Sequence, residues 1–92
     1  MEPLAAKLQS AVSALRELGA RRVLLFGSYA SDPEHARDLD LAVEGIPLER
    51  LGTAGLECYR RLRVPLDLVS HEESPAFFDL IAQDAVTLYE QR

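Results

Sequence analysis

Apolar residues divide the chain into segments of two kinds. From Leu4 to Leu18 they recur every three or four positions, as in an amphipathic helix, and Gly19 follows as a C-terminal cap. Residues 22–26 form a continuous apolar run of strand length that stops at Gly27. The same criteria predict helices over residues 47–62 and 75–81 and strands over residues 38–43 and 64–69, with Arg37 as an alternative start of the second strand. Residues 85–89 fit either a short edge strand or a further turn of helix.

The second predicted strand places two carboxylates on one face. Because successive side chains of a strand point to opposite sides, Leu39 and Leu41 face a core while Asp38 and Asp40 share the other face. Two like charges side by side raise each other's pKa unless a cation lies between them, and Mg²⁺ prefers carboxylate and phosphate oxygens. Taken alone, the pair would be the solvated polar face of an edge strand. With the residues around it, we expect a metal–phosphate site.

Those surrounding residues are Gly27, Ser28 and Asp67. Gly27 and Ser28 end the first strand, where a glycine lets backbone N–H groups approach a phosphate. Ser28 is also an acceptable N-cap for a short helical turn, which is compatible with anion binding. In the third strand Asp67 points away from Leu66 and Leu68, the direction that a third carboxylate of the site requires. The alternative for Asp67 is an ordinary surface aspartate.

In this order, the residues resemble the signature of minimal nucleotidyltransferases of the DNA polymerase beta superfamily. A hydrophobic strand ends in Gly27 and Ser28, nine residues follow, and Asp38, Leu39 and Asp40 come next, with Asp67 on a later strand. Residues 81–90 also look like the usual ending of the family. The resemblance implies the polymerase-beta palm, an α+β fold (an α/β two-layer arrangement) in which a mixed sheet of three to four strands packs with helices.

The resemblance also implies roles for these residues. Asp38, Asp40 and Asp67 would hold two Mg²⁺ ions, with Mn²⁺ as a possible replacement, and Asp67 would help to deprotonate the incoming hydroxyl. Gly27 and Ser28 would hold the phosphates of ATP or another nucleoside triphosphate.

Three positions depart from the family pattern. Tyr29 and Asp32 stand where many relatives have an arginine and a glycine, and Arg37 stands where many have a serine. These departures concern nucleotide binding rather than the carboxylates. Arg37 is the candidate to replace the missing arginine.

Family members of this length resemble antitoxins of prokaryotic toxin–antitoxin pairs. The resemblance implies transfer of a nucleoside monophosphate, AMP from ATP being favoured, to a hydroxyl of an all-helical HEPN-type toxin, at a tyrosine. The alternative is a catalytically weak or inactive binding module that neutralises the same partner by forming a complex. A third possibility, transfer to a small molecule, would require a further domain or a separate chain.

Length and composition limit the number of domains, the kinds of partner and the expected location. At 92 residues the chain has the length of one domain, residues 1–92, and its net charge of −5 argues against direct nucleic-acid binding. The single Cys58 cannot form an internal disulfide and is interpreted as a small buried hydrophobe on a helix, so a cytoplasmic location is expected. No apolar run approaches the length of a membrane span, and no membrane association is expected.

The remaining candidates for chemistry are weaker. His35 and His71 have no metal-ligand partner at a useful spacing and are interpreted as loop residues. Arg60, Arg61 and Arg63 cluster at the end of the second long helix, where cations complement the helix dipole. The alternative for this cluster is a contact with an acidic partner or with a nucleotide phosphate.

Overall fold

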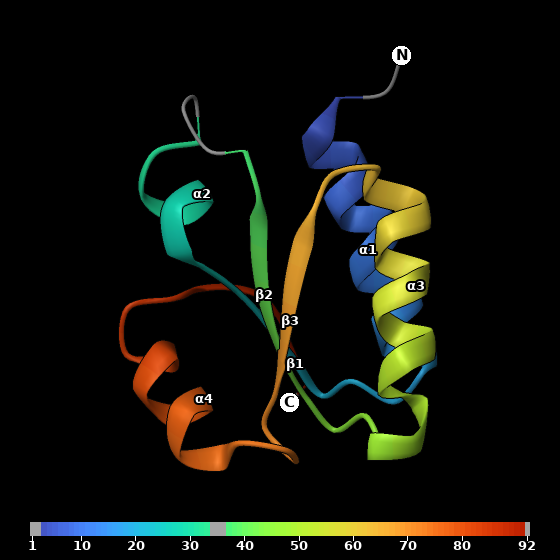
Figure 1. The fold of residues 1–92 in the computed structure, drawn as a ribbon, viewed down its shortest axis with the longest axis vertical. Coiled ribbons are helices and arrows are strands. Elements are labelled where there is room, and N and C mark those ends of the chain that lie inside the picture. Colours follow the sequence, from blue (N-terminus) through green and yellow to red (C-terminus); the bar gives the residue numbers. More distant parts are fainter. Residues whose placement is uncertain (1–2, 34–36, 92) are drawn as a thin grey trace.

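A mixed four-stranded sheet forms the centre of the protein, described here by a computed structural model covering residues 3–33 and 37–91. The strands are β1 (Arg22–Phe26), β2 (Leu39–Glu44), β3 (Leu66–Ser70) and β4 (Val86–Glu90), in the spatial order β3-β2-β1-β4. β1 is antiparallel to β2 and β4, whereas β2 and β3 are parallel (Figure 1). The expected α+β fold with a mixed sheet is therefore confirmed.

Three strands differ in their limits from the prediction. β2 begins at Leu39 rather than at Asp38 or Arg37, so Asp38 lies in a bend just before the strand. The region over residues 85–89 is an edge strand, β4, so the helical alternative for it was wrong. β3 begins at Leu66 rather than at residue 64, since Pro65 has no N–H to give to the ladder. The carbonyl of Pro65 still contributes, because it accepts a hydrogen bond from the backbone N–H of Leu39 at 3.0 Å.

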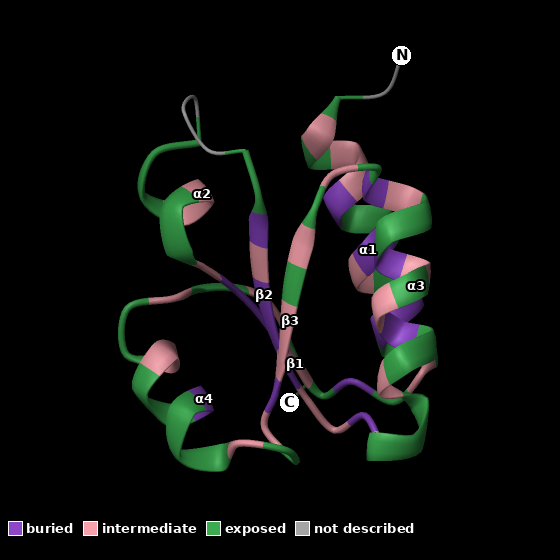
Figure 2. Cartoon of the chain, in the orientation of Figure 1, coloured by how far each residue is buried: buried purple, intermediate pink, exposed green. Residues whose placement is uncertain are grey.

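Two long helices cover one face of the sheet. α1 (Leu4–Glu17) and α3 (Leu51–Leu62), which follows the short 3-10 helix η1 (Leu48–Arg50), lie side by side on this face (Figure 1). The main core lies between helices and sheet and is fully buried, as the purple segments of Figure 2 show. Its fully buried side chains include Ala11, Leu15, Val23, Leu41, Val43, Ile46, Cys58 and Leu62. The interpretation of Cys58 as a buried hydrophobe is confirmed.

The opposite face carries the two short helices, α2 (Gly27–Ser31) and α4 (Pro75–Ala82). α4 inserts Phe78, which is fully buried against Leu24 and Ala42. In Figure 1 α4 lies against one end of the sheet, and α2 stands at the other end, near the start of β2. The helices thus leave part of this second face to polar side chains.

A polar cluster fixes α4 to the sheet. Arg22 bonds to Glu44 at 3.1 Å and lies 4.8 Å from the centre of the Phe78 ring. His71 packs edge-on against the same ring, with a centroid distance of 5.1 Å. His71 therefore lies in the turn after β3 in a structural role, as expected, while His35 is outside the described residues.

None of the described helices has the length and hydropathy needed to cross a membrane.

Candidate active site

Parallel pairing of β2 and β3 brings two of the predicted carboxylates together. Asp40 and Asp67 are direct partners in the register of the two strands, so both side chains leave the same face of the sheet. That face is the one away from α1 and α3, because the alternate residues Leu39 and Leu41 are buried in the main core. The nearby Asp67 carboxyl group helps to raise the pKa of Asp40.

Asp38 completes the cluster at longer range. It is exposed and raises the pKa of Asp40 through its charge, although less than Asp67 does. Partial burial, then the charges of Asp67 and Asp38, raise the pKa of Asp40 above its ordinary value. All three predicted carboxylates therefore interact, with Asp40 at the centre.

Gly27 packs directly against the Asp40 carboxyl group. Phe26, the last residue of β1, is the register partner of Asp40, so the chain turns into α2 immediately beside this side chain. A Cβ atom on Gly27 would lie 2.1 Å from Oδ2 of Asp40, far inside van der Waals contact. The backbone φ of Gly27 is +76°, in the left-handed region. Both observations explain why the turn requires glycine.

The start of α2 lies at the same place. Ser28 is exposed in the first turn, but it does not cap the helix as expected, because the N-cap position belongs to Phe26. The helix instead has a serine near its other end, where Ser31 Oγ lies 3.4 Å from the carbonyl oxygen of Gly27 and 3.3 Å from that of Ser28. Ser28 is exposed and directly follows Gly27, which packs against Asp40.

Two of the positions that depart from the family pattern have different surroundings. Tyr29 is half-buried and packs against the main core, so its ring serves the fold. Arg37 is exposed immediately before Asp38 and is the predicted site residue for which the structure gives no contact among the described residues.

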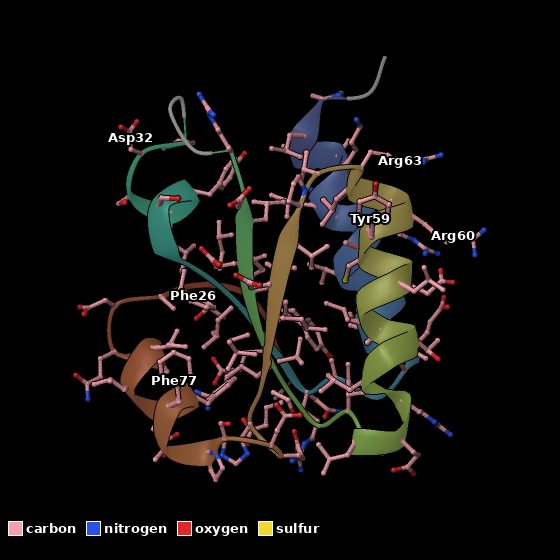
Figure 3. All side chains as sticks on the ribbon, viewed as in Figure 1. Phe26, Asp32, Tyr59, Arg60, Arg63 and Phe77 are labelled. Atoms are coloured by element: carbon pink, nitrogen blue, oxygen red, sulfur yellow. The ribbon has the colours of Figure 1, made fainter. Side chains whose placement is uncertain are left out.

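A pocket of about 360 Å³ adjoins the carboxylate cluster. Gly27 and Ala30 of α2 form one wall, and Leu80, Ile81 and Val86 of α4 and β4 form the other. Figure 3 shows Phe26, which also lines the pocket, between α2 and α4. Sequence reasoning missed this pocket, because nothing in the local pattern pairs residues 27–30 with residues 80–86.

Two larger pockets, of about 540 and 550 Å³, lie between α1 and β4 and share Arg16 and Tyr89.

Asp40 and Asp67 can bind a divalent cation as a pair, and Asp38 adds a third negative charge nearby. Within residues 3–33 and 37–91, no three His, Cys, Asp or Glu side chains are close enough together to hold a metal ion without rearrangement. Three carboxylates repel one another, so closer approach requires a cation between them. Mg²⁺ commonly uses one or two carboxylates together with substrate phosphates, and the contact between Asp40 and Asp67 suits that mode.

Comparison with known proteins places this arrangement in a family. No protein-family model and no curated protein matches the sequence. A solved structure described as "Structure of putative minimal nucleotidyltransferase" is similar with a TM-score of 0.77 and 30% sequence identity, over 92% of this chain and 92% of that one. A second, described as "Crystal structure of the toxin-antitoxin with AMP-PNP", shares the fold with a TM-score of 0.75 at 19% identity, over 91% of this chain and 73% of that one. On this similarity and its own sheet order and carboxylate positions, the chain belongs to the minimal nucleotidyltransferase family.

Proposed function

We propose that the protein transfers a nucleoside monophosphate from a nucleoside triphosphate to a hydroxyl group, with AMP from ATP as the favoured pair. The observation that carries this proposal is the direct pairing of Asp40 with Asp67, with Asp38 in electrostatic contact and Gly27 packed against Asp40. Three carboxylates beside a glycine turn suit the binding of metal ions and phosphates. Membership of the minimal nucleotidyltransferase family supports the reaction class.

Asp38, Asp40 and Asp67 would hold two Mg²⁺ ions, for which Mn²⁺ could substitute. When bound, the ions would neutralise phosphate charge and lower the pKa of the attacking hydroxyl. Asp67 is exposed while Asp40 is partly buried, so Asp67 is the carboxylate that an incoming hydroxyl can reach, and we assign it the acceptance of the proton. Phosphoryl transfer depends mainly on positioning and charge stabilisation, and fixing Asp40 between Gly27 and Asp67 supplies the positioning.

Nucleotide phosphates would lie at the turn from β1 into α2. Without a side chain, Gly27 allows close approach to its backbone, and the exposed hydroxyl of Ser28 can donate a hydrogen bond. Arg37 precedes Asp38 and would balance phosphate charge from the opposite side of the cluster. Because a tyrosine replaces the usual arginine at position 29, we expect weak binding of the triphosphate in the absence of metal.

The acceptor is proposed to be a hydroxyl of a protein partner, an all-helical HEPN-type toxin, with the present chain acting as its antitoxin in the cytoplasm. The neighbour solved as a toxin–antitoxin structure with AMP-PNP supports this setting. The competing proposal is a binding module that neutralises the partner without catalysis. It is favoured by the exposed apolar side chains of Leu80 and Val86 beside the pocket, which are 62% and 48% exposed.

The decisive experiment uses ATP labelled at the α-phosphate, Mg²⁺, the purified protein and a candidate all-helical HEPN-type partner. Transfer of label to the partner, lost in Asp40→Asn and kept in Asp79→Asn, is the expected result. Asp79 is the matched control, since it is an exposed aspartate on α4. A stable complex that carries no label would replace the enzyme proposal with the binding module. Equal labelling by the wild type and Asp40→Asn would refute the assigned site.

A further inference from the structure

The outer face of α3 carries apolar side chains that no described residue covers. Leu56 and Tyr59 of α3 are 58% and 48% exposed, and Leu48 of the adjoining η1 is 53% exposed, although other apolar side chains of α3 are buried. Beside them Gly52 and Gly55 border open space, because a Cβ atom on either would meet no atom within 4 Å. Each glycine lowers the stability of a helix, and the packing of α3 within this chain does not explain why two are present.

The exposed positions form a regular seam. Glu49, Gly52, Leu56, Tyr59 and Arg63 follow one another at spacings of three, four, three and four residues. Gly52, Leu56 and Tyr59 lie on α3 itself, Glu49 lies in η1 just before it, and Arg63 caps its end. This is the spacing at which one helix presents a continuous stripe to another helix in a coiled coil. The centre of the seam is apolar, and its two ends carry opposite charges.

The charged ends are not neutralised by neighbours. Arg60 and Arg61 both pair with Glu57 on α3 itself, so these two arginines of the cluster have an intrahelical partner. Across the described residues, no ion pair is found for Arg63 or for Glu49. Figure 3 shows Arg63 at the C-terminal end of α3, pointing away from the sheet. Its φ of +57° places it in the left-handed cap position that ends the helix.

We propose that this seam binds the same seam of a second copy of the chain, with the two α3 helices antiparallel. In that arrangement Leu56 lies at the two-fold axis, and Glu49 of each copy meets Arg63 of the other. Gly52 of each copy faces Tyr59 of the other, so the missing side chain leaves room for the ring. Because an isologous interface must be complementary to itself, the opposite charges at equal distances from Leu56 favour a second copy over an unrelated helix.

The dimer leaves the carboxylates accessible. α3 covers the face of the sheet opposite to Asp40 and Asp67, so the two sites of a dimer would open on its outer sides. The seam is short, because α3 has 12 residues and is therefore about 18 Å long. We expect a weak dimer that forms at micromolar to millimolar concentration. This inference is independent of the proposed function and of any metal or nucleotide.

Sedimentation equilibrium of the full chain over that concentration range tests the dimer. We expect the mass to rise from 10.2 kDa towards twice this value. Leu56→Glu should weaken association by more than about tenfold, since it places two like charges at the two-fold axis. Leu80→Glu is the matched control, because Leu80 is 62% exposed on α4, away from the seam, and this variant should associate like the wild type. A monomer at every concentration, or equal behaviour of the two variants, would overturn the proposal.

A charge exchange tests the orientation. Glu49→Arg and Arg63→Glu should each weaken association by roughly tenfold, since each creates two like-charge contacts in a symmetric dimer. The double variant should return to within about threefold of the wild type, because the complementary charges are restored with reversed sign. If the double variant remains as weak as the single ones, the antiparallel pairing is wrong. Circular dichroism checks that every variant is folded, and all these positions are exposed.

Discussion

Replacing Gly27 with alanine is the most direct perturbation of the candidate site. Two separate costs follow from the structure. An L-residue at a φ of +76° pays about 1–2 kcal/mol for the left-handed conformation. The new Cβ atom would also lie 2.1 Å from Oδ2 and 2.9 Å from Cγ of Asp40, so the carboxyl group must move away from its position opposite Asp67.

The backbone cost alone should lower the melting temperature by about 4–16 °C, given roughly 4–8 °C per kcal/mol in a domain of this size. We expect Mn²⁺ to raise the melting temperature of the wild type by binding the folded state, and the displaced carboxyl group should remove this rise. Thermal unfolding followed by circular dichroism, with and without Mn²⁺, measures both effects.

Gly55→Ala is the control for this experiment. Gly55 is inside α3, has no atom within 4 Å of an added Cβ and lies off the proposed seam. The same substitution should there stabilise the protein by about 1 kcal/mol, because alanine favours a helix. If Gly27→Ala instead melts at the wild-type temperature and keeps its response to Mn²⁺, the close packing of Gly27 on Asp40 is refuted.

Three further predictions follow from the described residues. Burial and the charges of Asp67 and Asp38 raise the pKa of Asp40, so the stability of the metal-free protein should fall as the pH rises from the ordinary aspartate pKa through the raised one. Asp40→Asn should therefore raise the urea midpoint at neutral pH without metal, and a lower midpoint would contradict the cause given for the shift. Burial raises the pKa of the Cys58 thiol to about 11, so iodoacetamide should label it only after denaturation, and rapid labelling of the native protein would exclude this burial. Phe78→Ala should destabilise the protein by about 3–5 kcal/mol in urea titrations, whereas Phe77→Ala, at a side chain 50% exposed, should cost under about 1 kcal/mol; similar losses would disprove the assigned packing.

Local pattern predicted the elements of this fold and the direction of the site side chains. Alternation along residues 39–43 is sufficient to place Asp40 opposite Leu39 and Leu41, because one strand face must be buried, whereas Asp38 lies just before the strand. Gly19, with a φ of +118°, ends α1 at the position that the sequence predicted. These features depend on near neighbours in the chain.

The sequence pattern did not predict which distant segments of the chain pair with one another. The contact of Asp40 with Asp67 depends on the parallel register of β2 and β3, and the sequence does not encode register as a local signal. The same holds for the approach of Gly27 to Asp40 and for the pocket between α2 and α4, since each joins segments brought together by the strand order. The assignment of Ser28 as an N-cap failed because α2 begins at Gly27, directly after β1, so the N-cap is Phe26, two residues earlier.

The strand order β3-β2-β1-β4 has a consequence for synthesis on the ribosome. The three strands β1, β2 and β3 are adjacent in space and complete by Ser70, so they can assemble while the rest of the chain is still being translated. β4 joins last, and it pairs with β1 across more than half the length of the chain. Until it docks, the edge of β1 is open to pairing with other chains. The nascent protein would therefore arrange its carboxylates before its sheet is complete, and the edge of β1 would be exposed only until residues 86–90 emerge and dock.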